Sequence, residues 1–212
     1  MIRFILLVIF LFSFLILSIP VFFVEWVIGK FNREMRDYSS LRIVQWGFKV
    51  ILKITGVSVT VIGEENVPDE PVLFIGNHRS YFDILLTYSR CRRLTGYIAK
   101  KEMERYPLLS TWMRNLYCLF LNRHDMRESL RVIRTAIDYI RQGISICIFP
   151  EGTRNRGEEL TMLPFKEGSF RIAEKTGCAI VPMSMNNTAA IFENHIPRIQ
   201  KVHVVLEYGK PI

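Results

Sequence analysis

The first apolar pattern in this chain is a long uncharged run. From Phe4 to Val24 no charged residue occurs over 21 positions, which at helical rise reach about 30 Å, the thickness of a bilayer core. The run predicts an uncleaved membrane anchor, and Pro20 leaves open whether the helix spans, kinks or lies half-buried. A secretory signal peptide would have a shorter apolar region, about 7–15 residues, and a small-residue cleavage site, which the segment 25–28 does not offer.

The second apolar pattern has helical spacing. The segment Leu41–Ile54 predicts an amphipathic helix, because its apolar residues recur on one face with lysines between them. Such a helix either lies in the membrane interface, with Trp46 at headgroup depth, or docks on a protein core. Basic residues outnumber acidic ones after the uncharged run: Lys30, Arg33, Arg36 and Arg42 against Glu34 and Asp37. By the positive-inside rule, this bias predicts that the rest of the chain is cytoplasmic.

From Gly56 onward, short apolar runs alternate with helical patterns. The expected strands cover Val57–Ile62, Val72–Ile75, Tyr97–Ala99, Leu119–Leu121, Ile144–Phe149, Ala179–Pro182 and Val202–Leu206. The expected helices cover residues 80–88, Leu108–Asn115, Met126–Arg141 and Gly168–Lys175. This alternation predicts an α/β fold, with a largely parallel sheet flanked by helices. The chain is therefore divided into a membrane-associated helical pair, residues 1–55, and an α/β domain, residues 56–212.

Charge and cysteine content narrow the choice of partners and compartments. A formal net charge of +8 favours a membrane surface, a phosphorylated substrate or a nucleic acid, against the alternative of an inert basic surface. The four cysteines form no Cys-x-x-Cys pair, which argues against a disulfide framework or a zinc site and favours a reducing compartment. Neither a Walker-type nor a dinucleotide-binding glycine motif occurs, so nucleotide hydrolysis and hydride transfer are poorly supported. Three histidines lack metal-ligand spacing, and no metal is expected: His124, His195 and His203.

The first motif that suggests chemistry follows the expected strand Val72–Ile75. It reads Asn77-His78-Arg79-Ser80-Tyr81-Phe82-Asp83. His78 is a candidate general base for a hydroxyl, with Asp83 orienting its imidazole as the aspartate does in serine proteases. Asp83 also fits a capping box with Ser80, a structural role that is compatible with the first. Since no Gly-x-Ser-x-Gly motif is present, a substrate hydroxyl is the best candidate for the nucleophile.

The second motif, Phe149-Pro150-Glu151-Gly152-Thr153-Arg154, also follows an expected strand. Arg154 offers a fork of donors to a phosphate, and Gly152 lets the backbone come close, although a solvated loop arginine is the alternative. Lys100, Lys101 and Arg123 are further phosphate candidates if their strands end at the same edge. Ligands of such sheets bind beyond the carboxyl ends of strands, where both motifs lie. Together the motifs suggest chemistry on a phosphorylated alcohol.

These motifs resemble those of the glycerophospholipid acyltransferases, most closely the bacterial 1-acyl-sn-glycerol-3-phosphate acyltransferases. Four family blocks occur in order between residues 77 and 183. The first matches Asn77, His78 and Asp83, and the second is similar to Lys100 or Lys101, Pro107 and Arg123, with Ser110 or a neighbour where a glycine often follows the proline. The third is complete at 149–154, including Phe149 and Pro150, and continues in Phe165-Lys166-Glu167-Gly168. The fourth looks like Ile180-Val181-Pro182-Met183.

The resemblance implies an acyltransferase of phospholipid biosynthesis. His78, held by Asp83, would deprotonate the free hydroxyl of 1-acyl-sn-glycerol 3-phosphate (lysophosphatidate). The alkoxide would attack the thioester of acyl-CoA or acyl-carrier protein, giving phosphatidic acid without an acyl-enzyme. Arg154 would bind the phosphate, with Glu151, Gly152 and Thr153 forming the turn and the cations at 100, 101 and 123 as second-rank candidates.

The same resemblance implies a setting for the reaction. The expected partners are the lipid bilayer, lysophosphatidate and the thioester co-substrate, with no separate cofactor and no nucleic acid. The expected location is a bacterial-type cytoplasmic membrane, with the catalytic domain on the cytoplasmic side. Two alternatives stay open: an acyltransferase with another lysophospholipid or an aminolipid as acceptor and, more distantly, a non-catalytic module that binds anionic lipid or nucleic acid.

Overall fold

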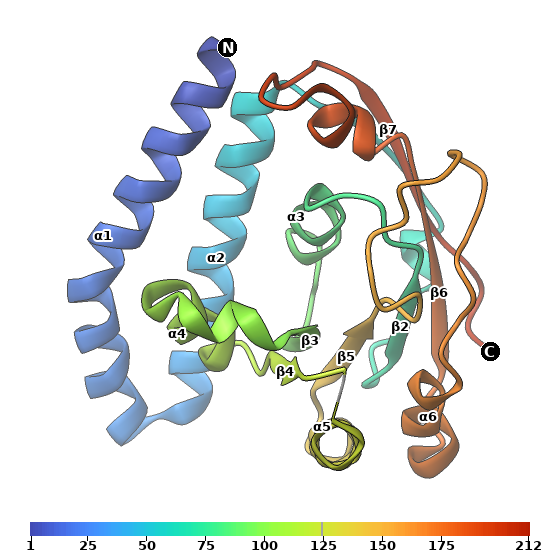
Figure 1. Cartoon of the computed structure of the whole chain (residues 1–212). Helices are drawn as coiled ribbons and strands as arrows, with labels where there is room; N and C mark the ends of the chain where they lie inside the picture. The colour runs from blue at the N-terminus through green and yellow to red at the C-terminus, as the bar shows by residue number, and fades with distance from the viewer. Residues whose placement is uncertain (124) are drawn as a thin grey trace.

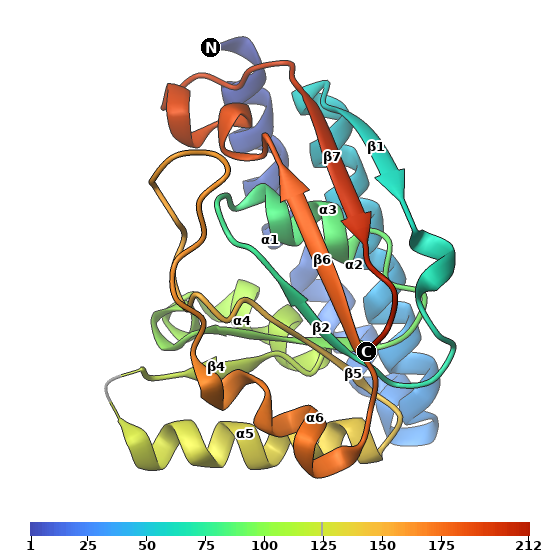
Figure 2. The ribbon, with the colours of Figure 1, turned by 90° about the vertical axis from the view of Figure 1, so that its right-hand side faces the viewer.

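The centre of the molecule is a seven-stranded sheet with the order β1-β7-β6-β2-β5-β3-β4 (Figure 1). The computed structural model describes residues 1–123 and 125–212, so the expectation for His124 lies outside the described residues. The strands are β1 (Ser58–Ile62), β2 (Leu73–Gly76), β3 (Thr95–Lys100), β4 (Leu119–Leu121), β5 (Ser145–Ile148), β6 (Ile180–Asn186) and β7 (His203–Tyr208). All neighbouring strands pair in parallel except β6 and β7, whose arrows point in opposite directions in Figure 2. The expected largely parallel α/β fold is confirmed.

Helices cover both faces of the sheet. They are α1 (Ile2–Phe31), α2 (Arg33–Thr55), α3 (Phe82–Tyr88), α4 (Pro107–Asn115), α5 (Met126–Arg141) and α6 (Arg171–Thr176). Successive residues of a strand point to opposite faces. Accordingly, Phe74 of β2 packs in the core shared with α2, α3 and α4, whereas Leu73 and Ile75 pack in the core shared with α5 and α6. Because both faces are covered, β2 is buried along its whole length, and this is why its sequence is continuously apolar.

The first two helices form a hairpin at the side of the sheet (Figure 1). Asn32 separates them and caps α2, its side chain accepting a hydrogen bond from the backbone N–H of Met35 at 2.9 Å. The helix α1 continues through Pro20 to Phe31 and is long and apolar enough to cross a membrane. It therefore extends past the uncharged run and includes Glu25, which is buried and accepts a hydrogen bond from Ser39 of α2.

The helix expected over Leu41–Ile54 is the later part of α2, and it docks on the core. Leu41 and Val44 are buried in the cluster that also contains the central strands. Trp46 is 58% exposed, and its ring lies 6.0 Å from that of Phe10 in α1. The helical pair thus shares a core with the α/β domain, although α2 ends at Thr55, next to the expected domain boundary.

The helix α1 also contacts the α/β domain directly, through Trp112 of α4. The Trp112 indole N–H donates to the hydroxyl of Ser18 at 2.7 Å, and the rings of Phe14 and Phe22 lie 6.0 and 4.9 Å from the indole ring. Two faces of α1 therefore differ, since one packs on protein while the other leaves large apolar side chains exposed. Among the latter are Ile5, Ile9, Phe12, Ile16, Ile19, Phe23 and Trp26.

Several elements differ in extent from the expectation, among them β3, which covers Thr95–Lys100 where Tyr97–Ala99 was expected. The helix expected over Gly168–Lys175 is a short 3-10 turn, Glu167–Ser169, followed by the six-residue α6. The strand β6 continues past Pro182 to Asn186 and alternates between buried and exposed residues there, where it pairs with β7. The continuous apolar run ends where this alternation begins, so the apolar pattern predicted a strand that is too short.

Candidate active site

His78 and Asp83 form a hydrogen-bonded pair just beyond the carboxyl end of β2. The His78 Nδ1 and Asp83 Oδ2 atoms are 2.8 Å apart, and the side chains are 15% and 0% exposed. The same carboxylate oxygen accepts the backbone N–H groups of Arg79 at 2.7 Å and Ser80 at 2.8 Å. Asp83 therefore orients the imidazole and caps the turn into α3. With Nδ1 facing the carboxylate, Nε2 is the ring nitrogen left for a proton from a hydroxyl.

The loop after β5 fixes the position of His78. Its backbone N–H donates to Glu151 Oε1 at 2.8 Å, and its carbonyl accepts the backbone N–H of Asn155 at 2.7 Å. The imidazole also stacks on the ring of Phe149, with centroids 4.3 Å apart and planes 10° from parallel. These contacts form because β2 and β5 are adjacent and parallel, with Ile75 opposite Ile148, so the loops that follow them leave the sheet together.

The residues of the glycine turn have distinct positions. Glu151 is buried, and its second carboxylate oxygen accepts the backbone N–H of Leu163 at 2.9 Å, so both oxygens bind backbone donors. Gly152 has φ of +71°, a backbone conformation that favours glycine, and the Lys166 side chain lies close to the position that a Cβ atom would take. Thr153 is exposed on the outside of the turn.

The remaining motif residues hold the loops in place. The Asn77 side chain binds both backbone groups of Met185 at 2.8 Å, which extends the pairing of β2 with β6 by one residue. The Pro150 carbonyl accepts the backbone N–H of Lys166 at 3.0 Å. Pro182 lies in β6 opposite Ile75. These residues therefore stabilise the strands and loops that carry the site.

Arg154 lies beside the first motif. One of its terminal nitrogens donates to the Tyr81 hydroxyl at 3.0 Å, and the other pairs with Glu193 at 3.3 Å. The guanidinium carbon lies 3.7 Å from the centroid of the Tyr81 ring. The structure thus brings together the histidine, the aspartate and the arginine that the two motifs supply.

The other three predicted phosphate ligands lie apart from Arg154. Lys100 pairs with Glu102, and Lys101 pairs with Glu104 and Glu128. The hydrogen bonds to Glu128 and Glu104 raise the pKa of Lys101. Within residues 1–123 and 125–212, no hydrogen bond or ion pair joins either lysine or Arg123 to His78 or Arg154. Lys100 ends β3, Lys101 follows it and Arg123 comes after β4, on the side of β5 away from β2.

Two residues that sequence reasoning did not single out organise the site. Arg79 is buried and donates to the carbonyl oxygens of Gly157 at 2.7 Å and Glu158 at 2.8 Å, which holds the loop after the glycine turn. Its position inside the histidine motif was an available signal. Glu193, far along the chain, contacts both motifs, and no local pattern marks it.

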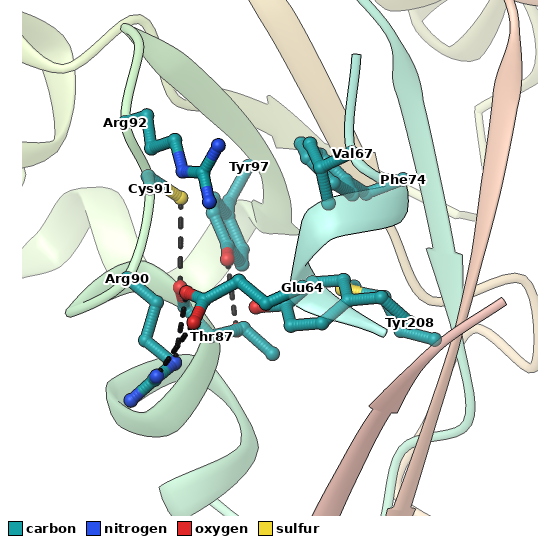
Figure 3. Close-up of a pocket in the computed structure, with 10 residues that line it drawn as sticks. Glu64, Val67, Phe74, Thr87, Arg90, Cys91, Arg92, Tyr97 and Tyr208 are labelled. Carbon is teal, nitrogen blue, oxygen red and sulfur yellow. Dashed lines mark hydrogen bonds and ion pairs between the residues drawn. The ribbon is translucent and has the colours of Figure 1, made fainter. Parts of the chain in front are cut away.

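A small cavity lies near the end of α3, with Thr87, Cys91 and Tyr97 among the residues that line it (Figure 3). Its volume is about 30 Å³, whereas sites that enclose a small molecule measure about 300–1,000 Å³. Figure 3 shows the Tyr97 hydroxyl directed at Thr87, whose own hydroxyl donates to the Asp83 carbonyl at 2.7 Å. Burial raises the pKa of Cys91 in its wall to about 11, which makes that thiol a poor nucleophile. The residues that line the cavity lie outside both motifs.

The chain is similar in sequence to known acyltransferases. Residues 58–186 match the family model described as acyltransferase. The chain is 30% identical over 166 residues to the 1-acyl-sn-glycerol-3-phosphate acyltransferase of Saccharomyces cerevisiae, which covers 78% of this chain and 55% of that protein. It is 35% identical over 149 residues to the protein of that name from Borreliella burgdorferi, covering 70% of this chain and 59% of that protein. The chain thus spans less than two thirds of the length of either relative.

A solved structure is similar over the whole chain. The crystal structure of the 1-acyl-sn-glycerophosphate (LPA) acyltransferase PlsC from Thermotoga maritima superposes with a TM-score of 0.75 at 27% sequence identity. The match covers 100% of this chain and 86% of that one, so it includes the helical hairpin as well as the sheet.

Proposed function

Because this chain belongs to the acyltransferase family, we propose that it transfers an acyl chain from a thioester donor to the free hydroxyl of 1-acyl-sn-glycerol 3-phosphate, giving phosphatidic acid. The observation that carries the proposal is the His78–Asp83 pair, fixed against the loop that bears Arg154. The acceptor is taken from the names of the relatives in yeast and Borreliella.

The dyad supplies the proton transfers of this reaction. His78 Nε2 takes the hydroxyl proton as the substrate oxygen bonds to the thioester carbonyl carbon, and Asp83 stabilises the imidazolium that forms. The carbon–sulfur bond then breaks, and the imidazolium returns the proton to the departing thiolate. The substrate oxygen is itself the nucleophile, so the reaction needs no acyl-enzyme. Stacking on Phe149 and the two backbone bonds keep the imidazole in one orientation throughout.

The phosphate of the acceptor binds at Arg154. This arginine lies next to the histidine motif, and its planar fork can make two parallel hydrogen bonds to phosphate oxygens. Glu151 and Gly152 shape the turn, and Thr153 borders it on the exposed side. Lys100, Lys101 and Arg123 are second-rank candidates, and their removal should affect acceptor binding far less than removal of Arg154. The two lysines would first have to leave their carboxylate partners: Glu102, Glu104 and Glu128.

We also assign the protein to a bacterial-type cytoplasmic membrane, with the catalytic domain on the cytoplasmic side. The exposed apolar face of α1 supports insertion, and a bilayer-bound acceptor makes it useful. Membranes washed in high salt should retain the protein, because salt screens charges but not apolar insertion. Protease should reach the α/β domain only in inside-out vesicles. Release by salt alone, or cleavage in right-side-out vesicles, would contradict this assignment.

An assay of the full-length protein in mixed micelles tests the activity. Lysophosphatidate would be incubated with a radiolabelled acyl chain on CoA or on acyl-carrier protein, and labelled phosphatidic acid measured. Comparison of the two thioesters identifies the donor, and a panel of other lysophospholipids and aminolipids tests the alternative acceptors. We expect His78→Ala to be inactive. Transfer that persists in this variant would overturn the role of the dyad, and failure to acylate any acceptor would overturn the proposed function.

A further inference from the structure

Glu193, which lies between β6 and β7, contacts both motifs. It belongs to a short 3-10 helix, Glu193–His195, which follows β6 and lies outside the residues 58–186 that match the family model. Its Oε2 atom accepts a hydrogen bond from the Ser80 hydroxyl at 2.7 Å, and Oε1 accepts the Tyr81 backbone N–H at 2.8 Å. Oε1 also pairs with Arg154 at 3.3 Å. One carboxylate therefore joins the histidine-bearing loop to the arginine.

The carboxylate is itself held firmly. Its side chain is 15% exposed, and two short bonds from Ser80 and Tyr81 fix both oxygens. The Tyr81 ring and hydroxyl hold the guanidinium from another direction. Arg154 thus lies between the held Glu193 carboxylate and the exposed Tyr81 ring, although its side chain is long and in other settings flexible.

Arg154 nevertheless keeps donors for a ligand. Each terminal nitrogen makes one hydrogen bond here, to Glu193 and to Tyr81, while a guanidinium carries further N–H groups on the same fork. These remaining groups can make two parallel bonds to a phosphate. A side chain that is already ordered loses less conformational entropy when the ligand binds, so preorganisation raises affinity.

We propose that Glu193 is a positioning residue for acceptor recognition, which holds Arg154 in the orientation that receives the phosphate. The inference rests on the proposed function, because it takes Arg154 as the ligand of the acceptor phosphate. It assigns to Glu193 an effect on the acceptor that is distinct from the proton transfers at His78. A carboxylate next to the guanidinium also repels a phosphate, so a lower acceptor KM after removal of the Glu193 charge is the result that contradicts the proposal.

The first experiment is steady-state kinetics of full-length Glu193→Gln, with each substrate varied separately. Glutamine keeps the size and an oxygen for the Tyr81 N–H but removes the charge that holds Arg154. We expect the KM for lysophosphatidate to rise about tenfold, as the loss of one hydrogen bond to a charged group implies. The kcat and the KM for the thioester should change little. Glu174→Gln on α6, an exposed carboxylate, is the matched control and should behave as wild type.

The second experiment is a double-mutant cycle with Arg154→Ala. If Glu193 acts through Arg154, Glu193→Gln should not change the acceptor KM further once the arginine is gone. The proposal is overturned by equal effects in both backgrounds, by a lower acceptor KM in Glu193→Gln, or by a fall in kcat alone. A wild-type protein that fails to acylate lysophosphatidate overturns both the function and the inference. An active wild type with an unchanged acceptor KM in Glu193→Gln overturns the inference only.

Discussion

The cations at the carboxyl edge of the sheet fall into two groups with different surroundings. Arg154 turns toward the β2 side, where its side chain is 24% exposed and is held by Tyr81 and Glu193. Lys100 and Lys101 follow β3, with side chains 58% and 45% exposed, and each is paired with carboxylates at the surface. All three were predicted as phosphate ligands from their place after a strand.

The difference between the groups concerns order more than charge. Exposed ion pairs such as those of Lys100 and Lys101 are screened by water and salt and hold their partners loosely. The Arg154 guanidinium is partly removed from water, stacks on the Tyr81 ring and pairs with Glu193, whose carboxylate is itself held by Ser80 and Tyr81. A position at the end of a strand therefore makes a cation available, whereas the packing around it decides whether it can recognise one ligand orientation.

The largest expected effect is that of a substitution in the His78–Asp83 dyad, which lies on the same side of the sheet as Arg154. We expect Asp83→Asn to lower kcat by about 10²–10⁴-fold, the usual contribution of a general base that is held and stabilised. Asparagine retains an oxygen for the backbone N–H groups of Arg79 and Ser80, so the cap on α3 and the thermal stability should persist. Kinetics and thermal unfolding of the same preparation would show this. A folded Asp83→Asn with normal turnover would leave Asp83 a structural cap only.

The next effect compares the two groups of cations directly. Arg154→Ala should raise the KM for lysophosphatidate about 10- to 100-fold, because it removes charge-assisted hydrogen bonds. Arg154→Lys should fall between this variant and wild type, since lysine keeps the charge but loses the planar fork. Lys100→Ala, Lys101→Ala and Arg123→Ala should each leave that KM nearly unchanged. A rise in this KM in Lys101→Ala as large as that in Arg154→Ala would show that the cations next to β3 also bind the acceptor.

A smaller effect concerns stability and compares Glu151, near Arg154, with Glu104, near Lys101. Glu151→Gln should destabilise the protein by about 1–3 kcal/mol, because an amide nitrogen would face one of the backbone N–H groups of His78 or Leu163 and leave it unpaired. Glu104→Gln removes only surface ion pairs with Lys101 and Arg114 and should change the stability little. Thermal unfolding in the same detergent measures both. Equal losses of stability in the two variants would show that burial of the carboxylate does not determine its contribution.

The smallest effect concerns the core beneath the β3 side. Burial raises the pKa of Cys91 to about 11 and that of Cys118 to about 12. A raised pKa lowers the thiolate fraction at pH 8, so alkylation of both residues in the folded protein should be slower than in the denatured chain. Mass spectrometry of peptides after timed labelling would measure this. Rapid labelling of Cys118 at pH 8 would contradict the prediction, because it would show that the core around this thiol opens to solvent.

Local sequence determined most of the fold. The continuous apolar run 72–75 and the run 144–149, apolar except for Ser145, marked strands covered on both faces, and the helical period of Met126–Arg141 marked α5. These signals are local because burial of a strand or of a helix face demands a particular spacing of apolar residues. The strand β6 was predicted too short, since its second half alternates and depends on pairing with β7.

The sequence also supplied the chemical groups of the site, because His78, Asp83 and Arg154 lie within two short motifs. Only the tertiary structure decided which distant groups surround them. The sheet order makes β2 and β5 neighbours and places β3 beyond them, which separates Arg154 from the lysines. The same fold returns the chain after β6 to the histidine loop, where Glu193 meets Ser80 and Arg154. Contacts between residues so far apart depend on strand order and loop path, which no local pattern of apolar and polar residues encodes.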